Sequence, residues 1–121
     1  MKTECLSDFV DFGGKTYPCP ISVAMDLIGG KWKAVILYHL QDEPRRFGEL
    51  RAALISVTEA ILSRQLKQLE LDGLISRQVF GDKPPLKTQY ELTAFGRSCL
   101  PVLAAITDWG NEVVTARGSF Q

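Results

Sequence analysis

The side chains with the most reactive chemistry in this chain are three cysteines, Cys5, Cys19 and Cys99, and one histidine, His39. Cys19 directly precedes Pro20, a residue type favoured at the first position of a helix. A thiol at the N-cap meets exposed backbone amides and the positive end of the helix dipole, and both favour the thiolate. The pattern therefore indicates a redox-sensing cysteine at position 19. The alternative is a small side chain packed beneath a partner helix.

Neither a metal centre nor catalysis is indicated by these groups. The cysteines are too few and too widely spaced for a disulfide framework or a zinc site, so we expect reduced thiols, no metal and no cofactor. An enzyme with Cys19 as nucleophile and His39 as base would need a third group to orient the histidine, and no Asp or Asn is placed to do so. We therefore expect that the chain is not an enzyme and that His39 is a core residue.

The basic residues are concentrated in the middle of the chain. Overall, 14 lysines and arginines balance 14 acidic residues, so the bulk charge does not favour nucleic acid. Between Lys31 and Arg97, however, there are eleven basic and eight acidic residues. This excess of positive charge makes the middle segment the part to examine for phosphate or base contacts.

The same segment predicts a helix-turn-helix. Residues 46–54 form a short amphipathic helix, and the turn Ile55-Ser56-Val57 separates it from a second helix. Ser56 and Glu59 match the capping box, in which the serine hydroxyl accepts the Glu59 amide and the glutamate returns the bond. The second helix should therefore open at Thr58.

The second helix should place its polar side outward, toward the major groove of B-form DNA, which is about 12 Å wide. Arg64 is the first candidate for reading a base, because a guanidinium can bond two acceptors of guanine. The further candidates for base or phosphate contacts on this helix are Thr58, Ser63, Gln65 and Lys67. Arg45 and Arg46, at the start of the first helix, are candidate phosphate contacts.

A hairpin should follow the second helix. Residues 75–79 and 88–92 alternate with period two, and the turn residues of Gly81-Asp82-Lys83-Pro84-Pro85 lie between them. Such a projecting hairpin is a wing. We expect Lys83 and Lys87 to reach the adjoining DNA backbone or minor groove.

The flanking helices are predicted to form a dimer interface. Pro20 opens a helix that Gly29-Gly30 ends, residues 31–40 form another, and Thr93 can cap a final helix. The final helix has an apolar face longer than one small domain can cover, so a partner chain is expected there. The predicted interface residues are Ile21, Leu100, Leu103, Ile106, Trp109 and Val113.

The predicted architecture is mainly α with a small β-hairpin, a winged helix-turn-helix that is dimeric through its N- and C-terminal helices. We expect residues 1–17 to be an arm, residues 18–113 the domain and residues 114–121 a tail. No apolar run approaches the roughly 20 residues that span a bilayer, and the start lacks an apolar signal core, so we expect a cytoplasmic protein.

The chain also resembles the HxlR-type family of winged-helix regulators, which is similar in fold to MarR-like proteins. The resemblance runs from Pro18 to about Glu112. Its residues are Cys19-Pro20, Asp26-Leu27-Ile28-Gly29-Gly30-Lys31-Trp32, Pro44-Arg45-Arg46-Phe47-Gly48-Glu49-Leu50, Leu66-Lys67-Gln68-Leu69-Glu70, Asp72-Gly73-Leu74-Ile75, Leu92-Thr93, Gly96, Leu100-Pro101-Val102-Leu103 and Trp109-Gly110. The turn Ile55-Ser56-Val57-Thr58-Glu59 departs from the usual sequence pattern of the family.

The resemblance implies a homodimeric transcriptional regulator that binds operator DNA and answers an electrophile or oxidant through a cysteine matching Cys19. Two alternatives stay open. One is a regulator of the same fold that binds a small aromatic effector near Trp32, Phe47 or Trp109 instead of using a thiol switch. The other is a winged helix that serves only protein contact.

Overall fold

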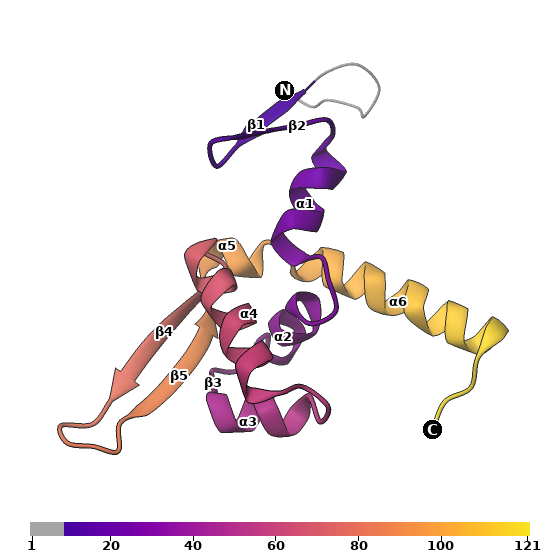
Figure 1. Cartoon of the computed structure of the whole chain (residues 1–121). Helices are drawn as coiled ribbons and strands as arrows, with labels where there is room; N and C mark the ends of the chain where they lie inside the picture. Colours follow the sequence, from indigo (N-terminus) through magenta and orange to yellow (C-terminus); the bar gives the residue numbers. More distant parts are fainter. Residues whose placement is uncertain (1–8) are drawn as a thin grey trace.

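The computed structural model describes residues 9–121, and Cys5, with the rest of the first eight residues, lies outside that range. The elements follow in the order β1 (Val10–Phe12), β2 (Lys15–Tyr17), α1 (Pro20–Ile28), α2 (Lys33–His39), β3 (Arg45–Arg46), α3 (Phe47–Ala53), α4 (Glu59–Leu71), β4 (Ile75–Phe80), β5 (Lys87–Leu92), α5 (Ala94–Arg97) and α6 (Leu100–Arg117). Figure 1 shows α2, α3 and α4 at the centre, the β4–β5 ribbon on one side and α6 projecting on the other.

The predicted arm contains a small hairpin, β1 and β2, that its sequence did not predict. Val10 pairs with Tyr17 and Phe12 with Lys15, and Gly13 and Gly14 form the turn between the strands. Both glycines have positive φ, 58° and 79°, which a two-residue hairpin turn requires. Strands of three residues are too short to show a period of two. The Tyr17 hydroxyl donates to the Asp26 carboxylate at 2.8 Å, which ties the hairpin to α1.

The helices bury their apolar sides in one core, which the sheet closes. Leu62, Leu66 and Leu69 of α4 are at most 1% exposed, so the rotation of α4 about its axis is fixed. Burying each such side chain contributes about 1.5–3 kcal/mol. The core consists of Ile28, Ile36, Leu37, Leu40, Leu50, Leu54, Val57, Leu62, Leu66, Leu69, Leu74, Ile75, Tyr90, Leu92 and Leu103.

The start of α4 differs from the prediction by its cap. Thr58, not Ser56, is the N-cap, and its hydroxyl oxygen accepts the Ile61 amide at 3.1 Å. Burial of Val57 explains the difference, because this side chain must enter the core before the helix begins. In the same turn Ile55 adopts a positive φ of 47° while 89% exposed, a backbone conformation that disfavours β-branched residues.

The wing belongs to a three-stranded antiparallel sheet in the order β3-β5-β4. Its third strand, β3, was predicted as the start of a helix. Arg45 pairs with Tyr90 and Arg46 with Gln89. A strand of two residues leaves no period in the sequence, and its pairing with β5 is visible only in the fold.

The predicted final helix is divided into α5 and α6. Thr93 caps α5 as predicted, accepting the Gly96 amide at 3.0 Å, and α6 starts anew at Leu100 and runs to Arg117, beyond the predicted boundary at Val113. Pro101 lacks the amide that would continue one helix through this segment. A Cβ at Gly96 would overlap the Leu74 carbonyl oxygen, so only glycine allows α5 to pack against the start of the wing.

Candidate nucleic-acid interface

The outer side of α4 is polar and exposed, as its periodicity predicts. Arg64, Ser63 and Lys67 are exposed, whereas Gln65 is half-buried on the packing side. Thr58, at the N-terminus of α4, is exposed, and its hydroxyl keeps its proton to donate because the oxygen acts as acceptor within the cap. The first turns of α4 therefore present a guanidinium and two hydroxyls to solvent.

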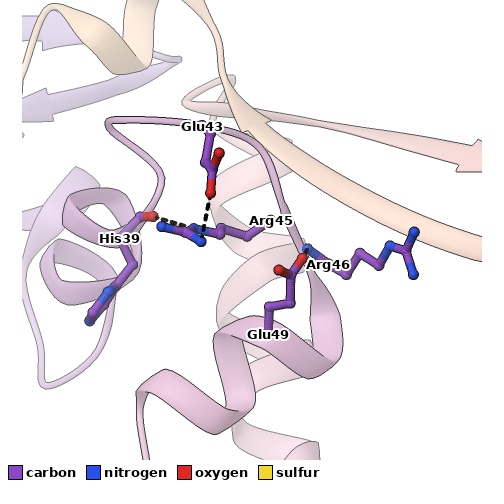
Figure 2. Close-up of polar contacts among 5 residues, drawn as sticks. All are labelled: His39, Glu43, Arg45, Arg46 and Glu49. Atoms are coloured by element: carbon purple, nitrogen blue, oxygen red, sulfur yellow. Dashed lines mark hydrogen bonds and ion pairs between the residues drawn. The ribbon is translucent and has the colours of Figure 1, made fainter.

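Arg45 and Arg46 are adjacent in sequence but have different surroundings (Figure 2). The Arg45 side chain is two-thirds covered, its Nε donates to the His39 carbonyl at 3.3 Å, and it pairs with Glu43 at 2.9 Å. This guanidinium is used inside the chain, which argues against Arg45 as the phosphate contact that the sequence suggested. Arg46 is exposed, and its side chain extends away from Glu49, whose carboxylate accepts the Arg46 amide at 2.9 Å.

The wing lysines are both exposed, Lys83 in the loop and Lys87 at the start of β5. Lys87 pairs with Phe80 and lies near Arg46 along a groove of about 630 Å³ beside the sheet. The groove is lined by Glu43, Pro44, Arg46, Glu49, Phe80, Lys87 and Gln89. The fold thus brings Arg46 together with Lys87, which the sequence could not show.

A second groove, also of about 630 Å³, lies between α4 and the base of the wing. It is lined by Ser63, Lys67, Glu70, Leu71, Arg77 and Tyr90. Arg77 was not among the predicted site residues, although it belongs to the basic middle segment. Burial raises the pKa of Tyr90, and the charge of the neighbouring Arg77 opposes that shift. Tyr90 is therefore a neutral hydroxyl at physiological pH.

The predicted interface residues separate into two groups. Leu103 is 4% exposed in the core of the chain itself, and Leu100 is half-buried against that core. Trp109 is 68% exposed and Ile21 65% exposed, and Ile106 and Val113 are also exposed. Ile106 lines an apolar groove of about 310 Å³ together with Ala34, Val35, Tyr38, Leu103 and Thr107. Leu103 thus contributes to the fold before any partner is considered.

Of the two described cysteines, only Cys99 is a free thiol. Cys19 is the N-cap of α1, as predicted, and is disulfide-bonded, so the expectation of reduced thiols does not hold there. The Cys99 thiol donates to the Gly96 carbonyl at 3.0 Å, and burial raises its pKa. Cys99 packs against the core.

The remaining candidate residues, His39, Trp32 and Phe47, do not form a catalytic or ligand site within residues 9–121. His39 is half-buried at the end of α2, with its ring edge-on to Tyr38. Trp32 and Phe47 pack against the core. Within residues 9–121, no three His, Cys, Asp or Glu side chains are grouped to hold a metal ion, and no helix is long and apolar enough to cross a membrane.

Comparison with known proteins identifies the family. The HxlR-like helix-turn-helix family model matches residues 27–117. The helix-turn-helix-type transcriptional regulator YdeP of Bacillus subtilis strain 168 is 45% identical over 102 residues, which are 84% of this chain and 76% of YdeP.

Solved structures confirm the predicted winged helix-turn-helix fold. The redox regulator HypR in its reduced form is similar with a TM-score of 0.77 at 38% identity, covering 84% of this chain and 99% of HypR. A transcriptional regulator of the MarR family from Porphyromonas gingivalis W83 gives a TM-score of 0.73 at 32% identity, covering 78% of this chain and 91% of that one. The chain belongs to the HxlR-like helix-turn-helix family and is a transcriptional regulator of the helix-turn-helix type.

Proposed function

We propose that the protein binds specific duplex DNA as a homodimer, with the N-terminal half of α4 in the major groove. The observation that carries this proposal is the exposed position of Arg64 on the outer side of α4, opposite the three leucines that hold the helix in the core. An arginine in this place can bond O6 and N7 of guanine. Thr58 and Ser63, exposed on the same helix, can bond a base edge or a neighbouring phosphate.

The other cations are assigned to the DNA backbone. Lys67 lies beyond the first turns of α4, and Arg46 and Lys87 lie along the groove beside the sheet. Lys83, in the wing loop, is assigned to the adjoining minor groove or its phosphates. Gln65 needs a side-chain rotation to reach a base because it is half-buried. Arg45 is left out of the interface.

The homodimer is assigned to the exposed apolar face of α6 together with α1. Ile106, Trp109 and Val113 recur at helical spacing along α6, and Ile21 is exposed on α1. Contiguous apolar patches of this kind on a small domain mark interaction sites. A second copy is the occupant that would also supply the second reading helix for a palindromic operator.

Selection of bound fragments from random DNA, followed by gel shifts over a salt series, tests this function. Retention of one sequence class, with affinity falling by about a thousandfold or more between 50 and 200 mM salt, is expected for several phosphate contacts. A module used only for protein contact would retain no fragment at any salt concentration, and this result would remove the proposal.

We further propose that DNA binding responds to oxidants through Cys19. Three observations support this: Cys19 caps α1, it is disulfide-bonded, and the similar HypR is a redox regulator with reduced and oxidised forms. Reduction would release a thiol at a helix N-terminus, where the thiolate is stabilised. The change would bias the dimer between two arrangements of its reading helices.

For the Cys19→Ser variant we expect operator affinity within about twofold of the reduced wild type, and no change of affinity on addition of diamide. The measurement is a gel shift before and after oxidant, with dithiothreitol to reverse it. Cys99→Ser is the matched control and should keep the response, because the Cys99 thiol is half-buried with a raised pKa. If the Cys19→Ser protein still responds to diamide, Cys19 is not the oxidant-sensing residue.

A further inference from the structure

The groove between α4 and β4 has a basic residue on each wall. Lys67 and Ser63 line it from α4, and Arg77 lines it from β4. Arg77 is paired with Tyr90 across the β4–β5 ladder, and directly paired residues project to the same face of an antiparallel sheet. Arg77 and Tyr90 are therefore side by side on the face of the sheet that borders α4.

The charges along the groove favour an anion. Lys67 and Arg77 supply two cations, and Glu70 supplies the one carboxylate among the lining residues. Nε of Arg77 lies 3.7 Å from a carboxylate oxygen of Glu70, and both side chains are partly exposed. A guanidinium has five N–H donors, so this ion pair leaves donors for a second acceptor. Glu70 restrains Arg77 on one side without neutralising the groove.

We infer that this groove receives the sugar–phosphate backbone of one DNA strand, with Arg77 as a phosphate contact. The inference rests on the proposed function. When a recognition helix occupies the major groove and a wing reaches the adjacent minor groove, the strand that separates those two grooves passes between helix and wing. The space between α4 and the base of the wing is that groove, and the phosphates would meet Arg77 and Lys67.

The two members of the Arg77–Glu70 pair have opposite roles in this arrangement. Arg77 attracts the phosphate, and Glu70 repels it while holding the guanidinium in place. If the pair served only to join α4 to β4, removal of either charge would lower the stability of the fold by a similar amount and leave DNA binding of the folded protein unchanged.

The test measures affinity for the selected operator fragment as a function of salt, using the Arg77→Gln and Glu70→Gln variants of the full chain. Arg77→Gln should weaken binding about tenfold and reduce the slope of log affinity against log salt by about 0.9. Glu70→Gln should tighten binding, since a repulsive charge is lost. Arg117→Gln, at the far end of α6 from the wing (Figure 1), is the control and should change neither quantity.

A second measurement locates the contact on the DNA. Operator duplexes that carry a single neutral methylphosphonate, scanned along each strand, should include positions that weaken the wild type and leave Arg77→Gln unaffected. Equal sensitivity of both proteins at every position, or weaker binding by Glu70→Gln, would overturn the inference while operator binding itself stands. A wild type that retains no fragment would instead remove the proposed function.

Discussion

Most exposed side chains of α4 are charged or polar, whereas α6 also exposes several large apolar side chains. Arg64 and Lys67 remain hydrated on a helix that buries Leu62, Leu66 and Leu69 in the core. Trp109 and Ile106 extend from a helix that has only part of its apolar side in the core, through Leu103. Each Å² of apolar surface that is buried contributes about 25 cal/mol to stability, and surface left in water does not make this contribution. The exposed face of α4 needs no partner chain to keep it hydrated, whereas the exposed apolar face of α6 would be covered in the proposed dimer.

The largest effect is expected on the α6 side. Ile106→Glu places a charge on the apolar face, so we expect a monomer by sedimentation and a loss of operator affinity of about 100-fold, the usual scale of bivalent binding. Ala104→Glu is the matched control, because it lies two residues away and so about 200° around the same helix. A dimeric Ile106→Glu protein would place the interface elsewhere.

A smaller effect is expected on the α4 side. Arg64→Ala should weaken operator binding by about 1–3 kcal/mol and relax the preference for one base, because a base contact is lost. Lys83→Ala should weaken all sequences alike, as a phosphate contact does. Competition gel shifts with single-base operator variants measure both. Equal small losses for the two variants would undo the distinction between reading and anchoring residues.

The smallest effect concerns the turn between α3 and α4. Ile55 is exposed with a positive φ, which for a β-branched residue costs about 1–2 kcal/mol. Ile55→Gly should therefore raise the free energy of unfolding by about 1 kcal/mol, since glycine adopts this conformation without strain. Urea denaturation measures the change. A destabilised variant would show that the isoleucine side chain makes contacts that outweigh its strain.

Much of the fold could be predicted from the sequence because long elements repeat their pattern. The leucines at 62, 66 and 69 gave both the existence and the rotation of α4. The glycine and proline turns gave the wing. Short elements could not be found this way: β3 has two residues and β1 has three, fewer than a period-two pattern needs.

The site was predicted less completely, because the sequence gives the type of a side chain but not its neighbours. Arg45 and Arg46 are alike in sequence, and only the pairing of β3 with β5 sends them to opposite faces of the sheet. Arg77 acquires its place from its register opposite Tyr90 and from the flank of α4 that it meets. Periodicity put Leu103 on the same side of the helix as Ile106. How much of that apolar side is covered within the chain depends on the packing of α2 against α6, which the sequence does not give.

The break between α5 and α6 separates the DNA-binding part of the chain from the helix proposed to form the dimer. Gly96 seats α5 directly on the beginning of β4, so α5 and the wing form one unit, while Ser98 and Cys99 join that unit to α6. In a dimer held together by α6, the angle at this junction would fix how far apart the two reading helices lie. A change of one residue there would alter the spacing between operator half-sites while every DNA-contacting side chain stayed the same.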